Sequence, residues 1–332
     1  MEHTINVLRG SEQGKVQSGQ ITRSLSVSDA LVEVTHASLC GTDDLYLHSP
    51  QVLGHEGIGI VKDVGSDVKN VKVGDRVGFG YIQKVCDECE NCRSGWDQYC
   101  PNGKPYGKHD INVGLLASSV VYDAGSLIPV PPDLESSHAA ALMCSGATAW
   151  TVLTQYRIRP GERVGILGIG GLGHMAIKLA SAMGYHVVAM SRTESKKKDC
   201  LAFGANEFQS TTADDLHAMK KLDHLLICTS VSVDYKLIIS LMATHGTIYP
   251  LTVDLAPSSV PILSLTDQGL RIQGSVSASR KQMRQTLEFA AERKIEPEIT
   301  PFEWSAEGVE QAMKAMKAME ENTVRYKCVL TK

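Results

Sequence analysis

The 332-residue sequence predicts an α/β protein of two domains, one mostly β and one built on a doubly wound parallel sheet. Short β-rich runs broken by glycine fill residues 30 to about 130. Apolar strands then alternate with helical segments from about residue 144 to 274, which is typical of a parallel sheet covered on both faces. The length also favours two cores over one.

The strand candidates of the first region are ALVEVTHASL, GIGIVKDVG, DRVGFGY and SSVVYDAG, and the stiff segment PVPPDL at 129–134 suits a boundary. The second region reads RVGILG, HMAIKLASAMG, HVVAMSR, a polar helix ending in FGAN, then HLLICTS and GTIYPL. The last portion returns to short strands, RIQGSVSA and VRYKCVL, around helices at about 280–293 and 306–320.

Composition indicates a soluble enzyme without nucleic-acid or membrane partners. The formal net charge is -4 with a pI near 6.3, so no basic field is expected. No run of eighteen or more apolar residues occurs, and the first residues lack a signal-peptide core. We therefore expect a cytoplasmic protein whose nine cysteines are metal ligands and reduced thiols.

Four cysteines lie within the fifteen residues CDECENCRSGWDQYC: Cys86, Cys89, Cys92 and Cys100. Four thiolates at this spacing complete a tetrahedral Zn²⁺ shell with no vacant position, which predicts a structural site. Two disulfides are the alternative, although cysteines two residues apart suit a metal better than S–S geometry.

A dinucleotide site is predicted by GILGIGGLGHMAIKLA, where Gly168, Gly170 and Gly173 form G-x-G-x-x-G between an apolar strand and an amphipathic helix. The first glycine permits a tight turn, the second a close approach to pyrophosphate, and the third helix packing. The free N–H groups at the helix start would bind the phosphates.

The next strand, HVVAMSR, indicates which dinucleotide binds. Ser191 stands where NAD-binding proteins usually present a carboxylate to the ribose, and Arg192 and Lys196 follow it. Cations here would attract a 2′-phosphate, so NADP(H) is predicted. The alternative is that these cations form a solvated helix start.

A second metal site is suggested by Cys40, His55 and Cys144, which would hold Zn²⁺ through three protein ligands. The fourth position would take water, substrate or Glu56. Each residue alone would be ordinary core or loop, and only their combination with the other motifs favours a metal.

The chain resembles the zinc-dependent medium-chain alcohol dehydrogenases, in particular the NADP(H)-dependent aldehyde reductases of the cinnamyl-alcohol-dehydrogenase type. The matching motifs are CGTD, GHE, GDRVGFG, the cysteine cluster, LMCSGAT, GIGGLG, SRTESK and VRYK, in family order over nearly the whole chain. The resemblance implies a GroES-like catalytic domain at 1–143 and 275–332, a Rossmann domain at 144–274, a homodimer, and transfer of hydride between NADP(H) and an alcohol/aldehyde pair.

The resemblance also implies individual roles. Cys40, His55 and Cys144 would be catalytic-zinc ligands, and Glu56 would be an exchangeable ligand or a carboxylate just outside the ligand sphere. Asp43 would orient His55, and Thr42 would relay a proton. The predicted cofactor contacts are Thr148, Gly168, Gly170, Gly171, Leu172, Gly173, Ser191, Arg192, Lys196, Thr229, Gly274 and Ser275.

Two departures from the family pattern affect the proton relay and the substrate pocket. Leu45 replaces the histidine that often extends the relay, leaving His48 as a possible substitute. Only fourteen residues separate Cys40 from His55, fewer than is usual, so the wall of the substrate pocket should differ. A first alternative to an alcohol/aldehyde oxidoreductase is therefore an NADPH-dependent reductase of an iminium or conjugated C=C bond. A more remote alternative is a non-catalytic NADPH-binding protein.

Overall fold

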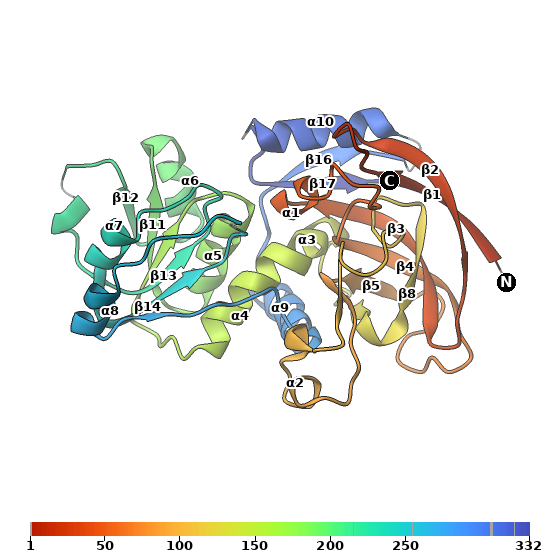
Figure 1. Ribbon diagram of the computed structural model, residues 1–332, viewed down its shortest axis with the longest axis horizontal. Helices are drawn as coiled ribbons and strands as arrows, with labels where there is room; N and C mark the ends of the chain where they lie inside the picture. The colour runs from red at the N-terminus through yellow and green to blue at the C-terminus, as the bar shows by residue number, and fades with distance from the viewer. Residues whose placement is uncertain (1, 215, 254, 306–307, 322) are drawn as a thin grey trace. The chain divides into compact units, whose positions relative to one another are not determined.

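A computed structural model of the chain describes residues 2–214, 216–253, 255–305, 308–321 and 323–332 (Figure 1). The chain divides into two units. Met1–Ala147 and Ser277–Lys332 form the β unit, and Thr148–Val276 forms the parallel-sheet unit. The domain boundaries expected from the sequence, at 143/144 and 274/275, are not tested by this division into units and stay a prediction.

The β unit contains a seven-stranded sheet in its described residues, with the order β16-β17-β3-β4-β5-β9 and β8 also paired with β3. Its strands are β3 (Asp29–Leu39), β4 (Glu56–Val64), β5 (Arg76–Phe79), β8 (Ser119–Asp123), β9 (Ile128–Pro129), β16 (Ile299–Glu303) and β17 (Lys327–Thr331). Two smaller pairs are β1 (Glu2–Arg9) with β2 (Gln17–Ser24), and β6 (Ile82–Lys84) with β7 (Lys104–Pro105). Its α-helices are α1 (Gly41–Asp44), α2 (Glu90–Arg93), α3 (Ser136–Ala141), α9 (Arg280–Arg293) and α10 (Val309–Glu320).

Alternating burial explains how this sheet forms a core. Val32 and Val34 of β3 are fully buried, and they pack in one cluster with Leu330 of β17 and Ala312 of α10. Helix α10 lies alongside β16 and β17 (Figure 1). The first two residues of its predicted range, 306–307, lie outside the described residues.

The parallel-sheet unit contains six parallel strands in the order β12-β11-β10-β13-β14-β15. They are β10 (Arg163–Leu167), β11 (His186–Ser191), β12 (Glu207–Ser210), β13 (Leu222–Ile227), β14 (Met242–Pro250) and β15 (Arg271–Ile272). The helices are α4 (Ala147–Gln155), which begins at the boundary, α5 (Gly171–Ala182), α6 (Lys197–Ala202), α7 (Tyr235–Ser240) and α8 (Ile262–Gln268).

The strand order makes this sheet doubly wound, since the chain moves outward from β10 in one direction and from β13 in the other. All five residues of β10 are buried, as a central strand covered on both faces requires. Ligands of such sheets bind at the carboxyl ends of the strands where the order reverses, here between β10 and β13. The predicted fold class is confirmed.

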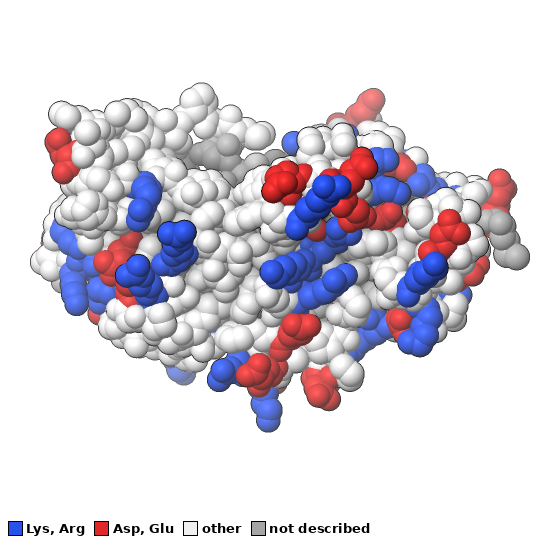
Figure 2. Space-filling model, turned by 90° about the horizontal axis from the view of Figure 1, so that it is seen from below, with Lys and Arg blue, Asp and Glu red and all other residues white. Residues whose placement is uncertain are grey.

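Surface charge on the viewed face is mixed. On this face Lys and Arg side chains lie among Asp and Glu side chains instead of forming one continuous basic field (Figure 2). Among the helices in the described residues, none combines the length and apolar character needed to span a bilayer.

Candidate functional site

Cys40 and His55 meet because β3 and β4 run antiparallel. Ser38 of β3 pairs with Glu56 of β4, so the residue after β3 and the residue before β4 lie at the same end of the strand pair. Cys144 comes from a π-helical turn, Leu142–Gly146, between α3 and α4. Such turns are frequent at functional sites because the extra residue redirects a side chain.

The three donor atoms have the spacing of a zinc site. His55 Nε2 lies 3.4 Å from Cys40 Sγ and 3.4 Å from Cys144 Sγ. All three atoms lie within 4.8 Å of one another. Zn–S bonds of about 2.3 Å and a Zn–N bond of about 2.0 Å at tetrahedral angles give an N···S separation of about 3.6 Å. Two thiols and one imidazole therefore fit zinc with one position left open.

Asp43 fixes the orientation of the His55 ring. Its side chain is buried, and Oδ1 lies 3.1 Å from His55 Nδ1 while accepting the Gly54 N–H at 3.1 Å. Oδ2 accepts the N–H of Cys40 at 3.1 Å. A proton on Nδ1 is thereby stabilised, and Nε2 keeps its lone pair for a metal.

Glu56 lies beside this group but is paired with Lys327, whose Nζ contacts Oε1 inside the protein. Burial raises the pKa of Glu56 to about 7, although the Lys327 ammonium acts to lower it. Oε2 is buried and accepts no hydrogen bond from the described residues. Glu56 is not among the three grouped donors, and its role as an exchangeable ligand stays a prediction.

Lys327 is the last residue of the VRYK motif, but no role was predicted for it from the sequence. The motif was the signal that could have found it.

The proton relay through Thr42 stays a prediction. Thr42 is half-buried in α1 and its backbone N–H donates to Cys40 Sγ at 3.4 Å. His48 is exposed, and its Nδ1 lies 3.4 Å from the carbonyl oxygen of Glu12. Its described contacts are thus with the N-terminal segment, and its substitution for the missing histidine stays a prediction.

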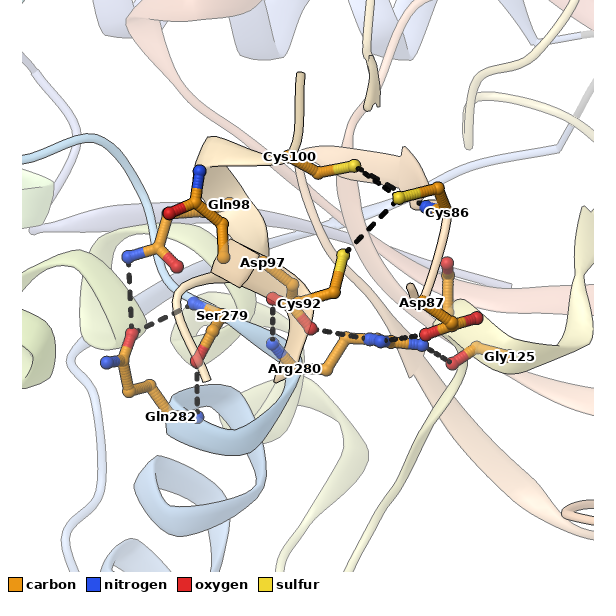
Figure 3. Close-up of polar contacts among 12 residues, drawn as sticks. Cys86, Asp87, Cys92, Asp97, Gln98, Cys100, Gly125, Ser279, Arg280 and Gln282 are labelled. Carbon is orange, nitrogen blue, oxygen red and sulfur yellow. Dashed lines mark hydrogen bonds and ion pairs between the residues drawn. The ribbon is translucent and has the colours of Figure 1, made fainter. Parts of the chain in front are cut away.

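The sulfur atoms of the four cysteines all lie within 4.8 Å of one another, close enough to hold one metal ion. Figure 3 shows three of them, Cys86, Cys92 and Cys100. Cys86 Sγ lies 3.5 Å from Cys100 Sγ and 4.0 Å from Cys92 Sγ, and Cys89 Sγ lies 3.5 Å from Cys92 Sγ. A zinc tetrathiolate gives S···S separations of about 3.8 Å, whereas a disulfide bond is about 2.05 Å long. The geometry fits zinc and leaves the disulfide alternative without support.

A polar network connects this loop to the start of α9 (Figure 3). Arg280, the first residue of α9, donates from its backbone N–H and Nε to Asp97 at 3.0 and 2.7 Å. Its Nη1 donates to the carbonyl oxygen of Gly125 at 2.9 Å, and its Nη2 contacts Asp87. Ser279 caps the same helix. No local pattern in the sequence indicates this link, because Asp97 and Arg280 are 183 positions apart.

The glycine motif in the parallel-sheet unit has the geometry that a dinucleotide needs. Gly168 has φ +93°, and a Cβ there would lie 2.7 Å from Thr229. A Cβ on Gly173 would lie 2.0 Å from the Gly168 carbonyl oxygen, so α5 packs directly on the turn. A Cβ on Gly170 would meet nothing within 4 Å, which leaves open space in front of the α5 N-terminus. Gly171 and Leu172 form the first turn of α5.

The residues predicted to select NADP(H) border the same loop. Ser191 ends β11, and Arg192 is exposed directly after it. Lys196 Nζ donates to the Ile169 carbonyl oxygen at 2.6 Å, which places a cation at the glycine loop.

The remaining predicted cofactor residues also belong to the parallel-sheet unit. Thr148 is buried on α4, and Thr229 follows β13. Gly274 accepts a hydrogen bond from the Tyr156 hydroxyl at 3.4 Å. Ser275 Oγ is buried, and no described residue hydrogen bonds to it.

Comparison with known proteins supports these assignments at the level of family. The family model "Alcohol dehydrogenase GroES-like domain" matches residues 26–132, and "Zinc-binding dehydrogenase" matches residues 171–292. A probable cinnamyl alcohol dehydrogenase of Pinus radiata is 32% identical over 327 residues, covering 93% of this chain and 89% of that protein. The chain belongs to the zinc-dependent medium-chain alcohol dehydrogenases of the cinnamyl-alcohol-dehydrogenase type.

Other relatives of this alcohol dehydrogenase agree. The NADP-dependent alcohol dehydrogenase C 1 of Mycolicibacterium smegmatis is 32% identical, covering 83% of this chain and 84% of that protein. The solved structure of a cinnamyl alcohol dehydrogenase of Sorghum bicolor superposes with a TM-score of 0.93 at 27% identity, covering 99% and 98% of the two chains. The predicted class, a zinc-dependent oxidoreductase of small alcohols and aldehydes, is confirmed.

Proposed function

We propose that this alcohol dehydrogenase reduces an aldehyde to a primary alcohol with NADPH. The observation that carries the proposal is the group of Cys40, His55 and Cys144, whose three donor atoms leave one metal position open. Arg192 and Lys196, in place of a ribose-binding carboxylate, support NADPH as the reductant. A relative at 32% identity is named as NADP-dependent, which agrees.

Bound zinc would supply Lewis acidity for the carbonyl oxygen, and NADPH the hydride. The residues of the chain orient the metal ligands, supply a proton and balance the charge around the metal. Asp43 holds the His55 ring so that Nε2 points toward both thiol sulfurs. The Thr42 hydroxyl, two residues after Cys40, is the proposed donor of the proton that the product alcohol gains. Lys327 neutralises the buried Glu56 carboxylate, which limits negative charge beside the metal ligands.

Steady-state NADPH oxidation with aliphatic and aromatic aldehydes, cyclic iminium ions and enones tests the proposal. We expect turnover with at least one aldehyde class and reverse oxidation of the matching alcohol with NADP⁺. Turnover confined to iminium ions or enones would contradict the assignment to carbonyl reduction. Binding of NADPH without consumption of any of these compounds would contradict the proposal of catalysis.

Arg192→Asp is expected to weaken NADPH binding by at least about tenfold, because a lost charge-assisted hydrogen bond to phosphate costs roughly 1.5–3 kcal/mol. NADH lacks the 2′-phosphate, so its dissociation constant should change little. Fluorescence titration of both nucleotides measures the effect. Lys236→Asp, at an exposed position of α7, is the matched control for charge. Equal weakening of NADPH and NADH would remove Arg192 from the 2′-phosphate site.

We also propose that two chains associate through the parallel-sheet unit. Strand β15 lies at an edge of the six-stranded sheet, where unpaired backbone groups favour addition of another strand. Leu255, Ile262 and Leu263 of the same unit are 84%, 67% and 72% exposed, which is high for large apolar side chains. Light scattering should give about twice the chain mass of 35.9 kDa.

Leu255→Glu with Leu263→Glu should convert this dimer to a monomer, because buried carboxylates would oppose association. The control pair Val27→Glu and Val73→Glu replaces exposed apolar residues of the β unit and should leave the mass unchanged. A wild-type protein that is monomeric at micromolar concentration would refute the association.

A further inference from the structure

A cavity of about 530 Å³ lies within the parallel-sheet unit, formed by residues that no part of the dehydrogenase site uses. Ligand pockets in proteins typically enclose about 300–1,000 Å³, so this volume suits a small metabolite. All of its lining residues fall between Gln155 and Gln273. The cavity therefore belongs to one unit of the chain.

The cavity lies at the amino ends of the parallel strands, and the glycine motif lies at their carboxyl ends. The lining residues come from the segment 155–162 before β10, the beginning of β13, residues 244–249 of β14, and residues 271 and 273 at β15. His224, Thr247 and Arg271 pair in register with one another and with the second residue of β10, which places most of this lining level with the amino end of β10. In a parallel sheet the amino ends of all strands lie on the same side of the sheet. The glycine motif follows the carboxyl end of β10, and five strand residues span about 16 Å. A ligand in the cavity would not occupy the cofactor position.

Three arginines give the cavity its positive charge. Arg157 and Arg159 are exposed, and their guanidinium groups have no hydrogen bond or ion pair with the described residues. Arg271 is held in place, since Nε donates to Thr247 Oγ1 at 3.1 Å and Nη2 to the His245 carbonyl oxygen at 3.0 Å. One fixed and two available guanidinium groups can bind an anion by several parallel hydrogen bonds.

The two carboxylates of the lining already have partners. Glu162 Oε2 accepts the backbone N–H of Arg159 at 2.7 Å and lies 3.1 Å from His224 Nε2. Asp223 Oδ2 accepts the backbone N–H of Arg163 at 2.9 Å. Burial lowers the pKa of His224, so this ring adds no positive charge at neutral pH. The arginines thus determine which ligand charge the cavity favours.

The backbone of the lining gives a second, independent observation. Arg157 has φ +64° and His245 has φ +65°, both in the left-handed region that non-glycine residues rarely adopt. Residues held in this region are strained, and they cluster at ligand sites. Both residues line the same cavity.

We propose that this cavity binds a small multivalent anion, a molecule carrying two or more phosphate or carboxylate groups, independently of the dehydrogenase reaction. Arg157 and Arg159 close on the anionic groups, and Arg271 provides the fixed contact. The shared chemistry is recognition of closely spaced oxyanions by guanidinium groups.

Isothermal titration calorimetry on the full zinc-loaded protein, saturated with NADPH so that the cofactor site is filled, tests this proposal. The probes are fructose 1,6-bisphosphate and, separately, tricarballylate. We expect one saturable site per chain for at least one probe, with affinity that falls as salt increases. If only fructose 1,6-bisphosphate binds, the natural ligand is a phosphorylated compound. If only tricarballylate binds, the natural ligand is a polycarboxylate.

Arg157→Glu with Arg159→Glu should weaken this binding at least about tenfold, since two attractive charges become repulsive. Both side chains are exposed, so the unfolding temperature and the NADPH affinity should stay unchanged. Lys236→Glu with Lys314→Glu makes the same charge change at other exposed positions and should leave the affinity unaltered. No saturable binding in the wild type, or equal binding by the wild type and the arginine variant, would overturn the proposal. An equal loss in the lysine variant would also overturn it.

Discussion

Replacing Cys40 with alanine should lower kcat for aldehyde reduction by at least about a thousandfold, because a three-ligand metal site that loses one thiolate no longer holds its Lewis acid. The NADPH dissociation constant should stay within about threefold of the wild-type value. The predicted cofactor residues, from Thr148 to Ser275, all belong to the parallel-sheet unit, whereas Cys40 belongs to the β unit. Single-turnover kinetics and nucleotide titration measure the two effects separately.

Cys200→Ala is the matched control, since Cys200 is a fully buried thiol of α6 that belongs to neither metal-binding group. Elemental analysis should give two zinc ions for this control and one for Cys40→Ala. A Cys40→Ala protein that keeps two zinc ions, or a tenth or more of the wild-type kcat, would contradict the assignment of the open site.

Replacing Cys100 with serine should destabilise the β unit by more than about 4 kcal/mol, the magnitude associated with loss of a structural metal or a buried network. Zinc content should fall from two ions to one. Amide hydrogen exchange should also become faster at the start of α9, because Asp87 and Asp97 of the cysteine loop hold Arg280 there. Thermal unfolding, elemental analysis and exchange mass spectrometry measure these three effects.

The control for the cysteine loop is Cys200→Ser, which changes the same atoms outside both metal-binding groups. The link to α9 has its own control within one helix. Arg280→Ala should reproduce the faster exchange at the start of α9 while zinc is retained, and Arg284→Ala, at an exposed position of the same helix, should not. Unchanged exchange in Cys100→Ser would show that the loop does not stabilise α9.

Local patterns in the sequence predicted the elements that depend on neighbouring residues. The helix at 280–293 has the predicted bounds, and β3 and β4 agree with their predicted ranges within one residue, because glycine and the apolar periodicity define them. RIQGSVSA was too long as a strand, since only Arg271 and Ile272 pair with β14. The hairpin of β1 and β2 was missed, because β2 is largely polar on both of its faces.

The contacts that the sequence could not predict join distant positions. The pairing of Lys327 with Glu56 depends on strand β17 lying beside β3, and β3 lying beside β4, which no local pattern encodes. The three-donor group was predicted from its combination with the glycine motif and the cysteine cluster, and the family resemblance then added to that prediction, since each of its residues alone has an ordinary explanation. The arginine-lined cavity depends on which loops meet at the amino edge of the sheet, and loop conformation carries little sequence signal.

The division of the chain has a consequence for evolution and for engineering. Every residue predicted to contact the dinucleotide lies in the single uninterrupted segment from Thr148 to Val276, while all seven cysteine and histidine donors lie outside it. One recombination event with junctions near 147 and 277 would therefore exchange cofactor preference, together with the arginine-lined cavity, as a single cassette. Metal chemistry would be inherited separately, from the sequence that flanks the cassette on both sides.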